Sequence, residues 1–378
     1  MASAPSRTQV DALDGRGARP LTDAGGRPDG PAPGGLVDDR LQGAMLQEVS
    51  RTFALTIPVL PEDLRCVVGN AYLLCRIVDT VEDEPALTGG ERARFSSDFV
   101  RVIAGDLDAR RFADELAPLL SEATLPAVRE LIRRTPYVVS ITRSFDERQR
   151  RAIERCVAIM AEGMVEFQAD DGCVGLPDQR AMDRYCYHVA GVVGELLTEL
   201  FCLHVPELQP RRGKMMALSR SFGQGLQMTN ILKDVWDDLE RGACWLPRSV
   251  FAEAGLDLSD LRTERGGPAF DQGLSELIGV AHGHLANALD YTLRIPSSQT
   301  GIRTFCLWTL GMAILTLRRI HRNRSYTSGD QVKISRRSVR TMATLSRVSA
   351  RRAPMVRALF AGAGLGIPRT AVEIDAAV

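Results

Sequence analysis

The sequence predicts an all-α protein built as a single domain. From about Leu41 onward, apolar residues recur at spacings of three and four, which is the period of one helix face. Alternating apolar and polar runs, which would indicate half-buried strands, are almost absent. No strong linker divides residues 41–361, so we expect these helices to share one core. Residues 1–40 are expected to form a disordered leader, and residues 362–378 a flexible C-terminal tail.

Prolines and glycines mark where each expected helix ends, because neither residue readily continues a helix. Such breaks fall at Pro58 and Pro61, Pro85, Gly172 with Pro177, Pro206 with Pro210, Pro247, Gly266 to Pro268, and Pro296. In chain order, the expected helices cover residues 41–57, 62–83, 90–105, 125–141, 147–168, 179–203, 213–240, 271–293, 299–322 and 336–361.

The composition argues against several classes of function. Of the 378 residues, 45% are hydrophobic and 25% are charged, and the formal net charge is zero, so bulk charge gives no support to nucleic-acid binding. The eight cysteines are scattered without a CxxC pair, which indicates reduced thiols in a cytoplasmic protein. The longest apolar run, residues 304–317, is shorter than the roughly 20 residues of a membrane span. We therefore expect no transmembrane segment, only possible peripheral contact with a bilayer, and no obligate protein partner.

Two acidic clusters lie within apolar helical runs, where charge is unusual. They are Asp79, Glu82 and Asp83 in one run, and Asp234, Asp237 and Asp238 in the other. In a helix, the spacing i, i+3 and i+4 places each set on one face. Either cluster alone is compatible with a solvated helix face. Two clusters facing each other across a bundle could hold several Mg²⁺ ions, and through them a diphosphate.

Other candidate site residues lie close to these clusters or in unusual helical runs. Arg76 precedes Asp79 by one turn, and arginine matches phosphate oxygens bidentately. The run from Tyr185 to Gly194 has two glycines three residues apart, which favours either a tight helix crossing or room for a ligand. Tyr185 could donate or accept a proton, or stabilise a cation through its ring. Phe305 could line the same pocket or belong to the core.

Five segments, in this order, resemble the squalene and phytoene synthases, a family of head-to-head prenyl transferases. They are Ser50-Arg51-Thr52-Phe53, the run from Tyr72 to Asp83, Gly163-Met164-Val165-Glu166-Phe167, the run from Tyr185 to Gly194, and the run from Gln227 to Asp238. The resemblance spans about residues 50–247 and implies the isoprenoid synthase bundle, which is all-α with a central active-site cavity. Residues 305–317 and Val332-Lys333-Ile334 are more similar to the squalene synthase branch.

This resemblance implies a reaction in which two farnesyl diphosphates are joined through presqualene diphosphate, with Mg²⁺, and the product is reduced by NADPH to squalene. It implies metal ligation by Asp79, Glu82, Asp83, Asp234 and Asp238; substrate contact by Ser50, Arg51, Phe53, Arg76, Gln227 and Asn230; catalytic roles for Tyr185, Phe305 and Arg76; and NADPH contact by Lys233, Lys333 and Arg336.

Three positions depart from the family pattern. Asp237 stands where these enzymes commonly have Glu, Ser335 stands at a usually basic position, and Thr309 with Leu310 replaces the usual Pro-Gln. The last two departures concern the reductive step. The alternatives are therefore a dehydrosqualene or phytoene synthase that needs no reductant and, in another class, a non-catalytic helical protein that binds prenyl diphosphates.

Overall fold

The computed structural model describes residues 39–50, 52–168, 174–262 and 265–374, and the regular elements among these residues are all helices, with no β-strand. The α-helices are α1 (Asp39–Val49), α2 (Phe53–Thr56), α3 (Glu62–Asp83), α4 (Gly89–Ala104), α5 (Ala109–Leu116), α6 (Pro126–Arg133), α7 (Thr135–Ser144), α8 (Glu147–Gln168), α9 (Gln179–Cys186), α10 (Val192–His204), α11 (Arg212–Glu240), α12 (Arg248–Glu253), α13 (Pro268–Arg294), α14 (Thr300–Arg322), α15 (Gly329–Val332), α16 (Arg336–Ser349) and α17 (Ala353–Ala363). The all-α prediction is confirmed.

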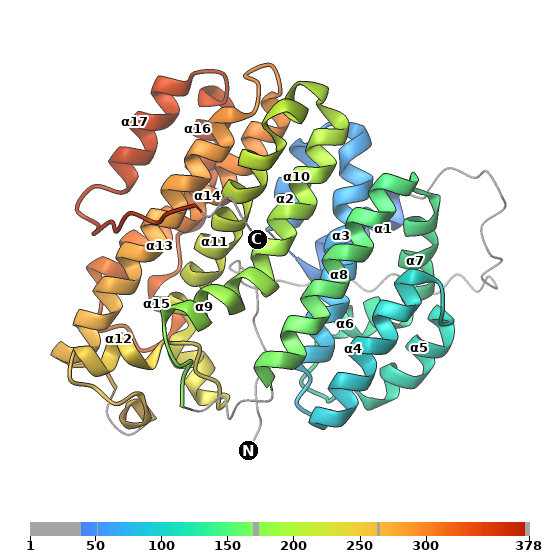
Figure 1. The fold of residues 1–378 in the computed structure, drawn as a ribbon, viewed down its shortest axis with the longest axis horizontal. Helices are drawn as coiled ribbons and strands as arrows, with labels where there is room; N and C mark the ends of the chain where they lie inside the picture. Colours follow the sequence, from blue (N-terminus) through green and yellow to red (C-terminus); the bar gives the residue numbers. More distant parts are fainter. Residues whose placement is uncertain (1–38, 51, 169–173, 263–264, 375–378) are drawn as a thin grey trace.

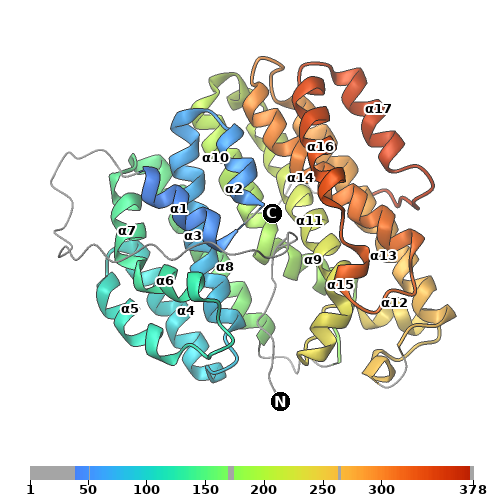
Figure 2. The same ribbon diagram turned by 180° about the vertical axis from the view of Figure 1, so that it is seen from behind.

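The long helices pack in a series around the middle of the molecule. Helix α3 packs on α8, α8 on α10, and α10 on α11, while α11 also packs on α13 and α14. The shorter helices α4–α7 lie at one side of this arrangement, and α16 and α17 lie at the other (Figures 1 and 2). Helix α11, at the centre, carries the second acidic cluster.

Some helix boundaries differ from the prediction, and local chemistry explains the differences. The expected helix 336–361 is two helices, because Pro354 has no N–H to continue the ladder at the start of α17. The carbonyl of Ala350, which follows α16, instead accepts a hydrogen bond from Arg303 Nη1 at 2.9 Å. The expected helix 125–141 is likewise divided, with Pro136 in the first turn of α7. Helices α5 and α12 form where no helix was predicted.

A π-helical turn, Tyr187–Gly191, joins α9 to α10. Such turns are rare and are frequent at functional sites. The turn and α10 approach α11 closely: a Cβ on Gly194 would lie 2.3 Å from the carbonyl oxygen of Ser219, and one on Gly223 would lie 2.2 Å from that of Ala190. Gly194 of the Tyr185–Gly194 run and Gly223 of α11 therefore serve a tight helix crossing.

The C-terminal residues continue the packed structure beyond the expected end of the domain at residue 361. The backbone N–H of Thr370 donates to the carbonyl of Gly279 on α13 at 3.0 Å, and Ile367 is buried. Residues 364–374 therefore pack along α13, where a flexible tail was expected. The expected leader lies outside the described residues, apart from the start of α1.

Two helical stretches, residues 179–204 and 300–322, are long and apolar enough to cross a membrane by length and composition. This is weak evidence for a span, because core helices pass the same test, and 83% of the apolar window in the second stretch is buried inside the molecule. The seven cysteines in the described residues are free thiols, as predicted. Cys173 lies outside those residues.

Candidate active site

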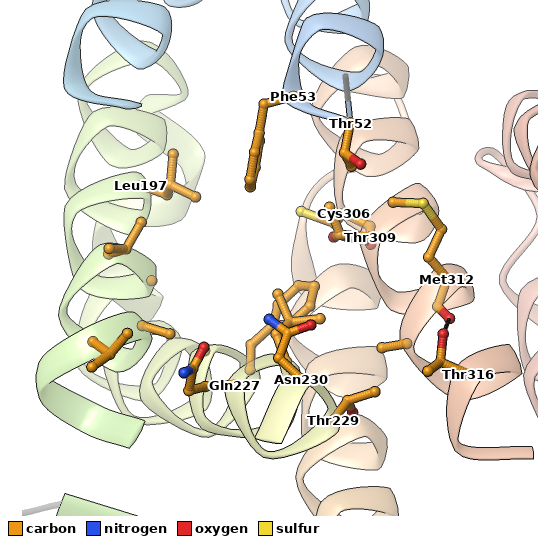
Figure 3. Close-up of a pocket in the computed structure, with 18 of the residues that line it drawn as sticks. Thr52, Phe53, Leu197, Gln227, Thr229, Asn230, Cys306, Thr309, Met312 and Thr316 are labelled. Carbon is orange, nitrogen blue, oxygen red and sulfur yellow. Dashed lines mark hydrogen bonds between the residues drawn. The ribbon is translucent and has the colours of Figure 1, made fainter. Parts of the chain in front are cut away.

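A large apolar pocket lies between α2, α3, α10, α11, α13 and α14. With its open mouth it encloses about 1370 Å³. Seven of the predicted site residues line it: Phe53, Asp79, Gln227, Asn230, Lys233, Phe305 and Lys333. Figure 3 shows Phe53 descending from α2 towards Gln227 and Asn230 on α11, with Leu197 on one side and Cys306, Thr309 and Met312 of α14 on the other. Residues far apart in sequence therefore meet in one cavity, as the prediction requires.

The first acidic cluster is at the C-terminal end of α3, where Asp79 faces the pocket. Burial raises the pKa of Asp79 to about 7; Arg76 opposes this rise and Asp83 adds to it. Burial also raises the pKa of Glu82 well above its usual range, helped by the charges of Asp83 and Asp79. One carboxylate oxygen of Asp79, Oδ2, is buried without a hydrogen-bond partner.

The second acidic cluster is on α11. Burial raises the pKa of Asp238 to about 7; Arg241, which donates to Asp238 Oδ1, opposes this rise, while Asp234 and Asp83 increase it. Because Asp83 belongs to α3, the charges of the two clusters act on each other across the site. Burial also raises the pKa of Asp234, against the attraction of Lys233, whose Nζ lies 3.0 Å from Asp234 Oδ2.

The short helix α15 covers part of this second cluster. The backbone N–H of Gly329 donates to Asp237 Oδ2 at 3.2 Å, and a Cβ on Gly329 would lie 2.6 Å from Asp234 Oδ1. Any larger residue here would displace the carboxylate of Asp234. Tyr326, just before α15, is fully buried and donates its hydroxyl to the carbonyl of Leu232. These contacts hold the acidic face of α11 in position against the C-terminal part of the chain.

The carboxylates of the two acidic clusters suit a cation that is also coordinated by water or by phosphate oxygens. No group of three His, Cys, Asp or Glu side chains in the described residues is arranged to hold an ion by itself. Mg²⁺ commonly keeps several waters and binds through one or two carboxylates together with phosphate oxygens. The unpartnered Asp79 Oδ2 and the raised pKa of Asp79 indicate a carboxylate whose charge the protein does not neutralise, and the pKa of Asp238 is raised in spite of its pairing with Arg241.

The predicted substrate-binding residues divide into two groups. The side-chain amides of Gln227 and Asn230 face the pocket and have no hydrogen-bond partner within the described residues, so they are free to bind a ligand. Ser50, in contrast, is buried and its Oγ accepts a hydrogen bond from the backbone N–H of Phe53 at 3.1 Å. This bond positions the Phe53 ring, which contacts Tyr72 at 4.8 Å between centroids. Arg51 lies outside the described residues.

Tyr185 lies beside the acids and does not line the apolar pocket. Its ring stacks on Trp245 at 4.1 Å between centroids and meets Phe167 edge-to-face at 5.3 Å. Burial raises the pKa of Tyr185 well above its usual range, and the charges of Glu82, Asp83 and Asp238 raise it further. The phenol is therefore neutral at physiological pH, and its hydroxyl can donate or accept a hydrogen bond.

Phe305 lines the apolar part of the pocket, where it is buried and meets Phe201 edge-to-face at 6.5 Å. Phe222 and Tyr291, at 5.9 Å, add a second aromatic pair to the lining. Phe201, Phe222, Tyr291 and the Trp245 that stacks on Tyr185 were not predicted. The only sequence signal for the first three is that each lies within an apolar helix, and most such residues are simply core.

The three residues predicted to bind NADPH are not equivalent. Lys233 and Lys333 both line the pocket, yet each is close to an aspartate: Lys333 Nζ lies 3.2 Å from Asp330 Oδ1, and Lys233 pairs with Asp234. Arg336 is exposed at the start of α16 and does not line the pocket. The structure therefore brings two of the three together.

The fold and the pocket define a helical bundle in which Asp79 of α3 lines an apolar, aromatic-lined cavity, and the charges of Asp83 on α3 and Asp238 on α11 act on each other. Residues 46–338 match the family model described as squalene/phytoene synthase, which is well over half of the chain. The chain therefore belongs to the squalene/phytoene synthase family.

Individual relatives agree with this assignment. The chain is 28% identical over 288 residues to squalene synthase of Yarrowia lipolytica, which covers 74% of this chain and 60% of the relative. It is 30% identical over 291 residues to squalene synthase 1 of Arabidopsis thaliana, which covers 76% of this chain and 66% of the relative. The chain thus spans less than two thirds of the length of these relatives.

Solved structures support the fold. A TcSQS structure with a ligand superposes with a TM-score of 0.69 at 22% identity, covering 86% of this chain and 97% of that chain. A dehydrosqualene synthase in complex with a ligand gives a TM-score of 0.58 at 18% identity, covering 82% and 95%. The overall arrangement of helices is therefore shared with both enzymes.

Proposed function

We propose that this protein condenses two farnesyl diphosphates head-to-head, through presqualene diphosphate, and reduces the product with NADPH to squalene. The observation that carries the proposal is the pocket itself. Asp79, Gln227 and Asn230 bring polar groups to a cavity whose remaining walls are apolar and aromatic. Such a cavity suits a molecule with a charged head and a long hydrocarbon chain.

The acidic end would bind and activate the diphosphate. Asp79, Glu82, Asp83, Asp234 and Asp238 would hold Mg²⁺, which supplies neutralisation of the charge that develops on a departing diphosphate. Gln227 and Asn230 would donate amide hydrogens to its oxygens, and Arg76 and Arg51 would add positive charge. Tyr185, neutral and next to the acids, would donate a hydrogen bond to the leaving group.

The apolar end would protect the carbocations. Water would quench an allylic or cyclopropyl cation, so the chain must exclude it from the reacting carbons. The rings of Phe305, Phe201 and Tyr291 line this part of the cavity, and aromatic faces attract cations. The buried positions of Phe305 and Phe201 keep these rings in fixed orientations.

The reductive step has weaker support than the condensation. NADPH would supply the hydride, with Lys233, Lys333 and Arg336 attracting its phosphates. Both pocket lysines are paired with aspartates, however, which reduces the positive charge available to a nucleotide. This observation favours the second candidate, a synthase that needs no reductant and releases dehydrosqualene or, from geranylgeranyl diphosphate, phytoene.

One incubation separates these functions. Purified protein is given farnesyl diphosphate and Mg²⁺, with and without NADPH, and a parallel sample is given geranylgeranyl diphosphate. Squalene that forms only with NADPH supports the proposal. Dehydrosqualene in both tubes, or turnover of geranylgeranyl diphosphate alone, supports the second candidate. Saturable binding of either diphosphate without any turnover would indicate the non-catalytic binder.

A further inference from the structure

The charges of this chain are distributed very unevenly. The formal net charge of the whole chain is zero, yet residues 331–372 contain eight arginines and one lysine and no aspartate or glutamate. Five of these arginines, at positions 340, 347, 351, 352 and 357, are exposed on or between α16 and α17. None of the five is paired with an acid within the described residues. This part of the chain therefore presents an uncompensated positive surface.

The same part of the chain exposes apolar surface. Helix α17 is mainly apolar in sequence, but Val356 is its only buried residue. Leu359 and Phe360 are half-buried, Leu365 just beyond the helix is 75% exposed, and Val348 on α16 is 56% exposed. An apolar helix that buries so little of itself is unusual in a soluble domain, where apolar faces are normally covered.

An apolar groove lies between α14, α16 and α17. With its open side it encloses about 1010 Å³. Its lining includes Leu310, Ile314, Leu345, Leu359 and Phe360. Apolar surface is therefore present both on α17 and in the groove between α17, α14 and α16.

These features share one edge of the molecule. Helices α16 and α17 lie side by side at the side opposite α4–α7 in both views (Figures 1 and 2). Helix α16 begins two residues after Ile334, which lines the central pocket with Lys333. The charged and apolar surface is thus continuous in sequence with the wall of the candidate active site.

We propose that α16, α17 and Leu365 form a surface that binds peripherally to a bilayer containing anionic lipids. The unpaired arginines contact lipid head groups, and the apolar side chains of α17, Val348 and Leu365 enter the boundary between head groups and acyl chains. A nucleic acid or an acidic protein would also attract the arginines. Neither would need an exposed apolar helix and an apolar groove among them, so the combination favours a bilayer. The proposal does not depend on the reaction that the pocket catalyses.

The test is co-sedimentation of the full chain with vesicles of phosphatidylcholine alone or of phosphatidylcholine mixed with phosphatidylserine. The wild-type protein is expected to bind only the mixed vesicles, and less at high salt. The triple variant Arg347→Glu, Arg351→Glu, Arg352→Glu is expected to bind them roughly a hundredfold more weakly, from the usual contribution of each basic residue near an anionic surface. Leu365→Asp is expected to weaken binding as well, which a purely electrostatic contact would not predict.

A matched control carries the same charge change elsewhere. Arg110, Arg143 and Arg148 are exposed residues on α5, α7 and α8, and their triple replacement by Glu is expected to leave vesicle binding unchanged. Circular dichroism of all variants establishes that they are folded. Equal binding of the wild type to both vesicles, equal loss in the two triple variants, or binding to a DNA duplex without binding to vesicles would each overturn the proposal.

Discussion

Replacing Asp79 with asparagine tests whether the pocket contains a buried carboxylate that binds Mg²⁺. Asp79 is 2% exposed, and its Oδ2 has no hydrogen-bond partner. Asparagine keeps the shape of the side chain and removes the charge. We expect the variant to lose turnover and any stabilisation by Mg²⁺, and to become more stable than the wild type at alkaline pH when no Mg²⁺ is present.

The magnitude follows from the pKa of Asp79, which burial raises from 3.8 to about 7. The folded state therefore binds this proton more tightly than the unfolded state, and the stability of the wild type falls as pH rises from about 4 to about 7. Above that range, the loss is constant. Between pH 5 and pH 8, the free energy of unfolding of the wild type should fall by about 2.5 kcal/mol more than that of Asp79→Asn.

The assay is urea denaturation of both proteins at pH 5 and pH 8 in EDTA, followed by thermal unfolding with and without Mg²⁺. Asp114→Asn is the control, because Asp114 is exposed on α5 and its replacement should change stability by less than about 0.5 kcal/mol at either pH. A free-energy difference between wild type and Asp79→Asn that does not change with pH would refute the buried charge. An undiminished rise in melting temperature with Mg²⁺ would refute the role of Asp79 in metal binding.

Three further predictions concern other parts of the structure. The apparent affinity for Mg²⁺, measured by calorimetry, should strengthen from pH 5 to about pH 8 and then level off, because Asp79 and Asp238, both with a pKa of about 7, are protonated at pH 5 and only half ionised at pH 7. A flat profile would contradict this. Gly223→Ala should lower the free energy of unfolding by about 3 kcal/mol, because its Cβ would lie 2.2 Å from the carbonyl oxygen of Ala190. The same change at Gly43, which has open space, should raise it by roughly 0.5 to 1 kcal/mol, and equal effects at both sites would contradict the tight crossing. Arg303→Leu should lower the free energy of unfolding, measured by urea denaturation, by about 3 kcal/mol, because the carbonyls of Leu293, Ile295 and Ala350 lose their donor. Arg319→Leu, on the exposed surface, should change it little. A similar loss in both variants would show that these three hydrogen bonds are not the cause.

The sequence predicted the helices around the pocket because they are long and end at prolines or glycines. Helix α3 was predicted with the observed bounds, and α8 likewise. Helices α5 and α12 were missed because eight and six residues are too few to show a clear helical period. The division of residues 336–361 was also missed, although Pro354 was visible. The carbonyl of Ala350, left free before this proline, is satisfied by Arg303, and that contact depends on the tertiary fold.

The acidic and amide residues of the site were easier to predict than its aromatic walls. A carboxylate in an apolar helix is costly, so two clusters of them in separate helices point to a function. A phenylalanine or tyrosine at helical spacing has the same pattern whether it faces the core or a cavity. Phe222 and Tyr291 were therefore not predicted, and Trp245 lies between α11 and α12, where no periodic pattern exists. Phe305 was predicted only through the resemblance to known enzymes, because a resemblance compares the residue type at each position. Hydrophobic periodicity distinguishes only apolar from polar positions.

Helix α11 contributes to both the polar end and the apolar end of the pocket. It has 29 residues, so at 1.5 Å per residue it spans about 43 Å and reaches past both ends of the cavity. Its Phe222 and Gly223 lie at the aromatic part of the pocket, and Asp234 and Asp238 follow about three and four turns later. Gly223 permits the close contact with the π-helical turn, whose Val189 and Ala190 line the pocket, while Gly329 permits the close approach of α15 to the acids. The arrangement of a charged end and an apolar end therefore depends on two glycine contacts with the same helix as well as on the carboxylates themselves.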